Sequence, residues 1–350
     1  MKIVVLCGGL STERDVSLIS GKMVYQALLE NGHQVILTDV FLGYPEPVEP
    51  EKAFEEDIDW FAVLPEFSGD FSIGKRKLDL SEVRSYRKDG GRSFFGPQVI
   101  PLCQAADIVF MALHGDCGEN GKIQAAFDLC GIRYTGTDSL SSALAMDKSF
   151  TKYLFAAHQI LSPAYHVLKD ASEDYHPDFP CVVKVNSGGS SVGVYIVRDR
   201  EAYEVAVREA FTYDHKVFVE EYIEGREFTD CVIEGEALPV VEIAPKSGFY
   251  DYKNKYEAGA TEETCPAKIS PALTKKIQEA AVKAYFALEI KTYARMDFRV
   301  DQNDNVYCLE ANTLPGMTPT SLVPIEAAAI GKSFPALCDW ILQISMDKYK

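Results

Sequence analysis

The chain has 350 residues, of which 47% are hydrophobic and 25% are charged, and these values argue against a largely disordered protein. Its 52 acidic side chains against 35 lysines and arginines give a net charge of −17, which argues against a nucleic-acid-binding protein, because phosphates attract basic surfaces. No apolar run approaches the roughly 20 residues that cross a bilayer, the start does not resemble a signal peptide, and no CxxC pair occurs. We therefore expect a cytoplasmic protein with free thiols that binds neither nucleic acid nor membranes.

Residues 1–138 predict a domain built on a parallel sheet. A continuous apolar run over 2–7 is typical of a strand buried on both faces, a helical pattern follows it, and 34–38 forms a second strand. The strand pattern resumes at 107–113. The intervening stretch 44–101 is rich in proline, glycine and charge, and we interpret it as an insertion or a long surface loop.

Two further αβ regions follow, so we expect three domains. Residues 139–225 begin with a helical pattern and continue with several short strands and one helix. Residues 226–350 contain strands, an irregular loop over 245–263, a long helix over 271–288 and a hairpin around 301–305. The expected fold class is α/β and α+β, with a parallel sheet in the N-terminal domain.

The predicted hairpin at 292–312 carries the most informative pattern. Arg295 and Asp297 alternate with apolar residues, so in a strand they lie on one face. The second strand ends with Glu310 and Asn312. If the strands pair, Asp297, Glu310 and Asn312 present hard oxygen ligands together, which suits Mg²⁺ bridging phosphates. The alternative is an exposed face of solvated charges.

A loop rich in glycine and serine at 186–191 joins two predicted strands, and Lys184 lies in the first of them. Such a loop can fold over a polyphosphate, because glycine lets backbone N–H groups approach anionic oxygens and lysine supplies charge. It matches neither GxxxxGK[ST] nor GxGxxG before a helix, and an ordinary hairpin turn explains it equally well. Lys148 is a second candidate phosphate contact, or simply the solvated start of a helix.

The strand predicted at 217–219 is followed by a polar edge. A strand edge can offer adenine a backbone donor and acceptor, and a carboxylate further along can hold ribose hydroxyls. The candidate residues are Glu220, Glu221, Tyr222, Ile223 and Glu227. Many amphipathic edge strands have the same pattern, so taken alone this segment favours an ordinary strand.

Two loops follow strands of the first sheet, one at 8–14 and one at 114–121. Ligands of open parallel sheets bind beyond the carboxyl ends of the strands, so both loops can face one cleft. Glu13 can then pair with a substrate ammonium and His114 with a carboxylate. Alternatively, Ser11 or Thr12 caps the helix and Glu13 sits in its first turn, which is compatible with binding.

A polar and aromatic segment over 248–256 precedes three small residues at 258–260. It can form a lid that closes over a reactive intermediate and excludes water. An ordinary surface loop has the same composition, and the sequence does not separate the two.

Taken together, these segments resemble the D-alanine–D-alanine ligases of the ATP-grasp superfamily over nearly the whole chain. The segments that carry the resemblance are Gly8-Gly9-Leu10-Ser11-Thr12-Glu13, His114-Gly115 with Gly118-Glu119-Asn120-Gly121, Met146-Asp147-Lys148, Gly189-Ser190-Ser191-Val192-Gly193, Phe249-Tyr250-Asp251-Tyr252 with Lys255-Tyr256, Arg295-Met296-Asp297, and Glu310-Ala311-Asn312-Thr313 with Pro315-Gly316-Met317-Thr318. Each is weak or moderate alone, and their order and spacing make the set specific.

The resemblance implies a three-domain ATP-grasp architecture and an enzyme that ligates two D-alanine molecules through an acyl phosphate, giving a peptidoglycan precursor. It implies ATP and two Mg²⁺ ions, with Mn²⁺ as an alternative, and a homodimer. The implied site comprises catalytic Glu13, Ser190, Tyr256, Arg295 and Gly316; substrate-binding His114, Ser321 and Leu322; ATP-binding Lys148, Lys184, Glu220, Glu221, Tyr222, Ile223, Glu227 and Lys255; and metal-binding Asp297, Glu310 and Asn312.

Residues that vary within the family bear on the acceptor. By resemblance, Tyr256 and Leu322 favour D-alanine in the second site, and D-serine or D-lactate are the alternative acceptors. The chain departs from many relatives at Gly188, Glu221 and Thr320, where Glu, Lys and His are common. A regulator that binds ATP without turnover is the competing class, and the presence of the expected catalytic and metal-binding residues argues against it.

Overall fold

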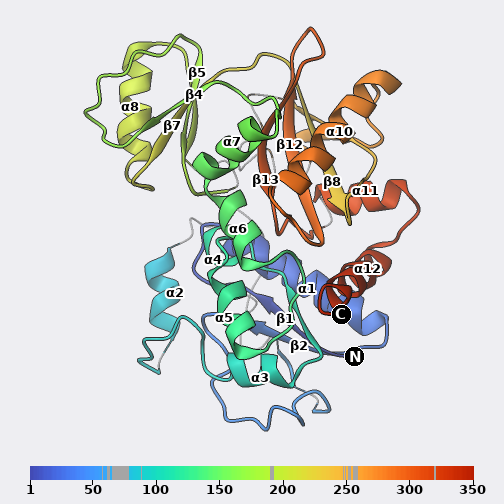
Figure 1. Cartoon of the computed structure of the whole chain (residues 1–350). Helices are drawn as coiled ribbons and strands as arrows, with labels where there is room; N and C mark the ends of the chain where they lie inside the picture. Colours follow the sequence, from blue (N-terminus) through green and yellow to red (C-terminus); the bar gives the residue numbers. More distant parts are fainter. Residues whose placement is uncertain are drawn as a thin grey trace. The chain divides into compact units, whose positions relative to one another are not determined.

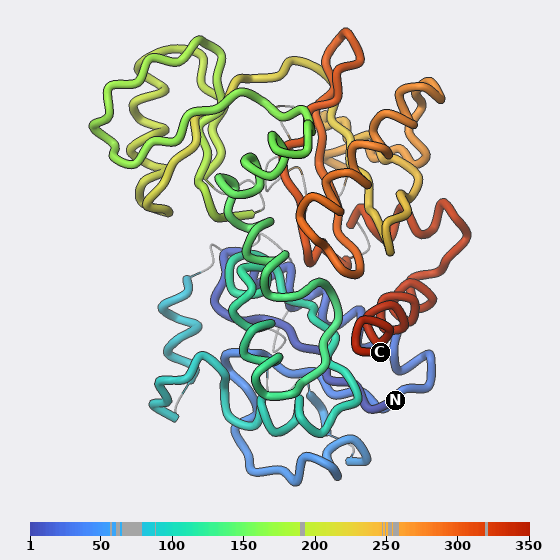
Figure 2. The backbone as a smooth tube through the Cα atoms, in the orientation of Figure 1, coloured from blue at the N-terminus to red at the C-terminus, as the bar shows by residue number. Residues whose placement is uncertain are grey.

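The computed structural model describes the chain except for residues 57, 61–63, 65–78, 88, 190–192, 247, 249, 251–253, 255–258 and 319–320 (Figure 1). It divides into two compact units. Unit 1 comprises Met1–Leu140, Lys291–Tyr293 and Thr313–Lys350, and unit 2 comprises Ser141–Ile290 and Ala294–Asn312. The chain thus returns to unit 1 near its end, as the red segment beside the blue one in Figure 2 shows. The three-domain division stays a prediction.

Unit 1 is built on a parallel sheet of strand order β2-β1-β3. The central strand β1 (Lys2–Cys7) is buried along almost its whole length, which explains its continuous apolar run. The flanking strands are β2 (Gln34–Asp39) and β3 (Ile108–Met111). The predicted parallel sheet is therefore confirmed. Because all three strands point the same way, the loops after them emerge at one edge.

Helix α1 (Arg14–Glu30) packs closely on this sheet. A Cβ on Gly21 would lie 2.5 Å from Cys7 Cβ, so only glycine permits this approach. The last helix, α12 (Phe334–Asp347), packs against α1. Asn31, after the end of α1, donates to Pro335 O at 2.9 Å.

Unit 1 also contains several shorter helices. They are α2 (Leu80–Tyr86), α3 (Val99–Ala105), α4 (Asp116–Glu119), α5 (Lys122–Cys130) and α11 (Leu322–Ala329). The described part of 44–101 is more than a surface loop, because Phe54, Trp60 and Leu64 are buried and α2 lies within it. Its weak periodicity had given no sign of this packing.

One sheet of unit 2 has the order β4-β7-β5-β6, and its pairings are antiparallel. The strands are β4 (Tyr165–Leu168), β5 (Cys181–Val185), β6 (Val194–Val197) and β7 (Val217–Glu221). Helix α8 (Arg200–Ala210) covers one face, and its Tyr203, Ala206 and Val207 pack with the buried valines of the sheet (Figure 1). Asp199 caps this helix by accepting the Ala202 N–H at 2.9 Å.

The other sheet of unit 2 has the order β11-β10-β8-β12-β13, with β9 paired to β8. The strands are β8 (Arg226–Ile233), β9 (Glu236–Ala237), β10 (Val241–Pro245), β11 (Thr261–Thr264), β12 (Tyr293–Val300) and β13 (Val306–Asn312). Helix α10 (Pro271–Ala287) begins at the cap Ser270 and packs through Ile277 and Ala281 into the core beneath β12. The predicted long helix and the predicted hairpin are both confirmed.

Two helices precede these sheets, α6 (Ser139–Met146) and α7 (Lys148–Ala157). The expected α/β and α+β fold class is confirmed. Among the described helices, none combines the length and the apolar character that crossing a bilayer requires.

Candidate active site

Unit 2 contains a cavity of about 150 Å³ that is lined by residues of both its sheets. Strands β5, β6 and β7 contribute one part of the lining, and β12 and β13 contribute another. Its lining includes Lys148, Lys184, Glu220, Glu221, Tyr222, Ile223, Glu227, Asp297 and Glu310. The structure therefore brings together most of the residues that the sequence assigned to ATP and metal.

The segment after β7 is fixed by an arginine that the sequence analysis did not assign to the site. Arg299 Nη2 and Nε donate to Ile223 O at 3.2 and 3.3 Å, and Arg299 Nη1 lies 3.2 Å from Glu227 Oε2. Its guanidinium also lies 5.9 Å from the centre of the Tyr222 ring. Arg299 thus holds the backbone edge and the carboxylate that were expected to meet adenine and ribose.

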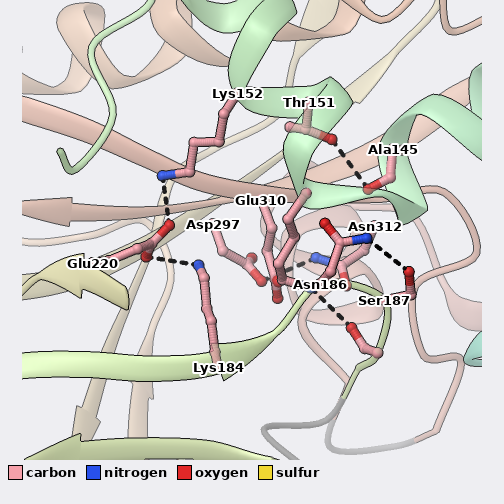
Figure 3. Close-up of polar contacts among 12 residues, drawn as sticks. Ala145, Thr151, Lys152, Lys184, Asn186, Ser187, Glu220, Asp297, Glu310 and Asn312 are labelled. Atoms are coloured by element: carbon pink, nitrogen blue, oxygen red, sulfur yellow. Dashed lines mark hydrogen bonds and ion pairs between the residues drawn. The ribbon is translucent and has the colours of Figure 1, made fainter. Parts of the chain in front are cut away.

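Glu220 lies between two lysines, as Figure 3 shows. Its carboxylate is 2.7 Å from Lys184 Nζ and 2.8 Å from Lys152 Nζ, and its side chain is only 3% exposed. Burial disfavours the charged form of Glu220, but the two ammonium groups outweigh burial and lower its pKa. Burial also lowers the pKa of Lys152, against the opposing attraction of Glu220. Sequence reasoning missed Lys152, because a lysine in a helix is ordinarily solvated.

Asn186 joins the two elements that carry the lysines of the cavity. Its Oδ1 accepts from Ser149 Oγ at 2.8 Å and from Ser149 N at 3.1 Å, and its backbone oxygen accepts the Lys148 N–H at 3.1 Å. The side chain is buried and follows β5, two residues after Lys184. The start of α7 is therefore tied to the end of β5, which sets Lys148 and Lys184 relative to each other.

Strands β12 and β13 pair as an antiparallel hairpin whose register shifts between Asp297 and Phe298. Asp297 pairs with Glu310 and Arg295 pairs with Asn312, so all four side chains belong to one face. Asn312 Nδ2 lies 3.0 Å from Asp297 Oδ2, and Thr229 donates to Asp297 Oδ1 at 2.6 Å. The expected convergence of Asp297, Glu310 and Asn312 is therefore observed, and the alternative of a merely solvated face is wrong.

Cations already neutralise this acidic face. Arg295 contacts Asp297 through two hydrogen bonds of 2.9 and 2.8 Å. Burial disfavours the Arg295 charge, yet Asp297 holds its pKa above the ordinary value. Lys148 Nζ lies 3.3 Å from Glu310 Oε2 and donates to Gly188 O at 3.0 Å. Two carboxylates on one face of the hairpin, with the Asn312 side chain beside Asp297, fit a magnesium ion that also contacts phosphate.

Three of the predicted site residues lie outside the described residues. They are Ser190 in the glycine-rich loop, and Lys255 and Tyr256 in the segment predicted as a lid. Their roles stay predictions.

In unit 1, the loops after β1 and β3 come together as expected. A Cβ on Gly115 would lie 2.6 Å from Glu13 Oε2 and 2.3 Å from Ser11 Oγ, so the backbone beside His114 runs against the Glu13 carboxylate. Glu13 itself occupies the N-cap position of α1, and no side-chain hydrogen bond caps the helix there. The alternative is confirmed in part, because Ser11 Oγ accepts the Glu13 N–H at 3.0 Å just before the helix, although Glu13 and not Ser11 is the N-cap residue.

A buried ion pair supports the Glu13 loop from the β2 side. Arg14 Nη2 lies 2.6 Å from Asp39 Oδ2, and both side chains are fully buried. Arg14 also donates to Gly9 O at 2.8 Å, and Asp39 Oδ1 accepts the Phe41 N–H at 2.7 Å. Sequence reasoning missed this pair, because Arg14 follows the pattern of an ordinary first helical turn.

The third predicted part of unit 1 is the segment before α11. Ser321 Oγ accepts the Thr318 N–H at 2.9 Å and lies 2.8 Å from Thr318 Oγ1. A Cβ on Gly316 would lie 2.7 Å from Ser321 Oγ, so a side chain there would displace the serine. Leu322 follows Ser321 as the first residue of α11, and its side chain is buried. Gly316, Thr318 and Ser321 thus lie close together.

This geometry, with a parallel sheet in one unit and two sheets lining a cavity of lysines and carboxylates in the other, defines an ATP-grasp enzyme. The family model described as D-ala D-ala ligase N-terminus matches residues 2–137, and the model described as D-ala D-ala ligase C-terminus matches residues 157–343. The chain belongs to the D-alanine–D-alanine ligase family.

Individual relatives resemble the chain over its whole length. The D-alanine–D-alanine ligase of Pediococcus pentosaceus is 42% identical, covering 98% of this chain and 97% of the relative. That of Lacticaseibacillus casei is 40% identical, covering 100% and 96%.

Solved structures show the same similarity. The Bacillus anthracis D-alanine–D-alanine ligase complexed with ATP has a TM-score of 0.72 at 29% identity, covering 99% of this chain and 97% of that chain. The VanG D-Ala:D-Ser ligase from Enterococcus faecalis has a TM-score of 0.72 at 30% identity, covering 98% and 99%.

Proposed function

We propose that this chain uses ATP to join two D-alanine molecules into D-alanyl-D-alanine, a peptidoglycan precursor. The carboxylate of the first D-alanine attacks the γ-phosphorus of ATP and forms an acyl phosphate with release of ADP. The amine of the second then attacks the acyl carbon, and phosphate leaves. The observation that carries the proposal is the 42% identity to a D-alanine–D-alanine ligase over 98% of this chain.

The cavity of unit 2 is the proposed ATP site. Lys148 and Lys184 would contact the phosphates, because each ammonium lines the cavity. The backbone of 220–223 would hold adenine, and Glu227 would accept the ribose hydroxyls. Support comes from Arg299, which fixes both the backbone oxygen of Ile223 and the Glu227 carboxylate before any nucleotide binds. Lys255 belongs to the same proposal by resemblance.

Asp297, Glu310 and Asn312 would hold two Mg²⁺ ions, with Mn²⁺ as an alternative. Metal bound there would supply Lewis-acid neutralisation of the transferring phosphoryl group. The pairing of Asp297 with Glu310 across the hairpin supports this assignment. Arg295 would stabilise the oxyanion of the tetrahedral intermediate, because its guanidinium is held rigidly by two hydrogen bonds.

The amino acids would be handled by residues of unit 1 together with the lid. Glu13 would hold the ammonium of the first D-alanine, with Ser190 and Tyr256 in the same hydrogen-bonded network by resemblance. His114 would lie beside that substrate. The turn before α11 would supply the Gly316 N–H as an oxyanion donor.

Ser321 and Leu322 would receive the second D-alanine. A second candidate function is ligation of D-alanine to D-serine, favoured by the similarity to the VanG D-Ala:D-Ser ligase. Leu322 opposes this alternative, because a buried leucine offers no polar partner to a serine hydroxyl. D-lactate is the remaining alternative acceptor.

A competition assay tests the proposal. The purified chain is supplied with ATP and Mg²⁺ and with D-alanine, D-serine and D-lactate at equal concentrations, and the products are separated by mass. We expect D-alanyl-D-alanine to dominate, with one phosphate released per product. Phosphate release with L-alanine would contradict the proposal, and ATP binding without turnover would indicate a regulator. A cytoplasmic homodimer is part of the same proposal, and light scattering of the purified chain tests the dimer.

A further inference from the structure

The backbone of residues 314–317, which carries Gly316, is held at its start by a carboxylate of α4. Glu119 Oε1 accepts the Leu314 N–H at 2.9 Å, and Glu119 Oε2 accepts the Gly115 N–H at 2.9 Å. One side chain therefore joins this segment to the loop after β3. Because the acceptor is ionised, both hydrogen bonds are stronger than neutral ones.

A second connection passes through His114 and Ser20 of α1. His114 Nδ1 lies 2.8 Å from Leu314 O, and Nε2 lies 2.8 Å from Ser20 Oγ. Ser20 Oγ also accepts the Met317 N–H at 3.2 Å. A carbonyl oxygen only accepts, so Nδ1 carries a proton. In the neutral ring, Nε2 then offers a lone pair. The Ser20 hydroxyl donates its proton to Nε2, and the Ser20 oxygen accepts the Met317 N–H.

These contacts leave the segment little freedom. Ser20 is 0% exposed and His114 is 3% exposed, and a buried group that loses its partner is costly. Leu314 is held through both its N–H and its carbonyl, and Met317 through its N–H. Between them lie only Pro315, whose ring fixes φ, and Gly316. The direction of the Gly316 N–H is therefore set from outside the segment.

We propose that Ser20 is a positioning residue that, through His114 and Met317, aims the Gly316 N–H. The inference rests on the proposed function, in which this N–H donates to the oxyanion of the tetrahedral intermediate. An oxyanion donor contributes only when it points at the position where the charge develops, so a small displacement lowers kcat. The proposed ATP site is the cavity of unit 2, and none of these side chains lines it. This role requires no direct contact between His114 and substrate.

The kinetic test compares Ser20→Ala with a matched control, Ser141→Ala. Ser141 is equally buried, and its hydroxyl donates to Glu289 O at 2.7 Å in unit 2. We expect S20A to lower kcat at least about tenfold while the KM for ATP stays within about twofold, and S141A to change neither. Both are assayed well below their unfolding temperatures. A kcat of S20A within twofold of wild type, or an equal effect of S141A, would overturn the proposal.

Glu119→Gln supplies the second variant, in case S20A does not fold. The amide keeps one acceptor oxygen and the shape of the side chain, but it turns an N–H₂ group toward one of the two backbone N–H groups. The same pattern is expected, a lower kcat with an unchanged KM for ATP. An unchanged kcat would contradict the proposal that side-chain contacts to residues 314–317 aim the Gly316 N–H.

A spectroscopic readout separates this inference from the proposed function. In the full chain with ¹⁵N-labelled histidine, we expect His114, assigned with a His114→Gln variant, to show a protonated Nδ1 and an unprotonated Nε2. S20A should shift the Nε2 resonance. A protonated Nε2 in the neutral ring would overturn the Ser20 relay even if D-alanyl-D-alanine is made. Absence of that product with the expected tautomer present would instead reject the proposed function alone.

Discussion

Replacing Asp39 by asparagine tests how much the buried ion pair of unit 1 contributes to stability. Arg14 Nη2 lies 2.6 Å from Asp39 Oδ2, and both side chains are 0% exposed. Asn keeps the size of the side chain and an Oδ1 that can accept from Phe41 and Leu42, so the change is largely one of charge. Breaking a buried pair from one side typically lowers the free energy of unfolding by about 3–5 kcal/mol, because the remaining charge stays desolvated.

An exposed pair of the same length supplies the matched control. Lys52 Nζ also lies 2.6 Å from Glu49 Oε2, but these side chains are 66% and 71% exposed. Water screens this pair, so Glu49→Gln should change the free energy of unfolding by about 0.5 kcal/mol or less. The two variants differ mainly in burial, which isolates desolvation as the cause of any difference.

Urea unfolding at pH 7, followed by circular dichroism and by fluorescence, measures both effects. Coincident transitions and an unchanged denaturant slope establish that the free energies are comparable. A loss below about 1 kcal/mol in Asp39→Asn, or a loss equal to that of Glu49→Gln, would show that the buried pair does not stabilise unit 1. Because Arg14 also anchors Gly9 O, we further expect Asp39→Asn to raise the KM for the first D-alanine through a looser Glu13 loop.

Three further predictions concern the metal face, the turn that carries Gly316 and the partly buried Lys348. Glu310→Gln should lower kcat, measured by phosphate release, at least about 100-fold. Because Glu310 is only partly buried, the same change should alter the free energy of unfolding in urea by under about 1 kcal/mol. Unchanged activity would reject the metal assignment. Gly316→Ala should lower kcat and raise the KM for the second D-alanine, because its Cβ would lie 2.7 Å from Ser321 Oγ; wild-type kinetics would reject the tight turn. Burial lowers the pKa of Lys348 to about 8 from its ordinary value of 10.5, so the folded state disfavours its charge and the unfolded state binds more protons between these values. The stability of wild type relative to Lys348→Met should therefore rise from pH 8 to pH 10.5, and a constant difference would contradict this.

Local patterns predicted the elements whose burial is periodic. The apolar run at 2–7 became the central strand of a parallel sheet, and the alternation in 293–300 placed Arg295 and Asp297 on one face. Two-residue periodicity is a property of the extended backbone itself, so it survives whatever packs around the strand. The pairing of Asp297 with Glu310 could not be predicted in this way. Phe298 pairs with Cys308, and a register shift between Asp297 and Phe298 is what places Glu310, rather than Leu309, opposite Asp297.

The supporting shell of the site could not be predicted in the same way. Lys152, Asp39 and Ser20 each have a partner that is distant in sequence, and the Ser20–His114 contact spans 94 residues. Lysine and serine in a helix are ordinarily solvated, so only the tertiary structure reveals that these side chains are buried and paired. The packing of residues 44–101 was missed for a related reason. Isolated buried residues such as Trp60 produce no periodic pattern in the sequence.

The charges of the unit 2 cavity explain how a strongly acidic chain can use a polyphosphate. Among the described lining residues, the cations Lys148, Lys184 and Arg299 are each paired with a carboxylate of the same cavity. A triphosphate alone would therefore meet little uncompensated positive charge and would lie close to several carboxylates. Divalent ions bound by Asp297 and Glu310, as proposed above, would reverse this balance and would compete with Lys148 for its present partner. ATP and the metal are thus expected to bind together, each increasing the affinity of the other, and the acidity of the cavity is what couples them.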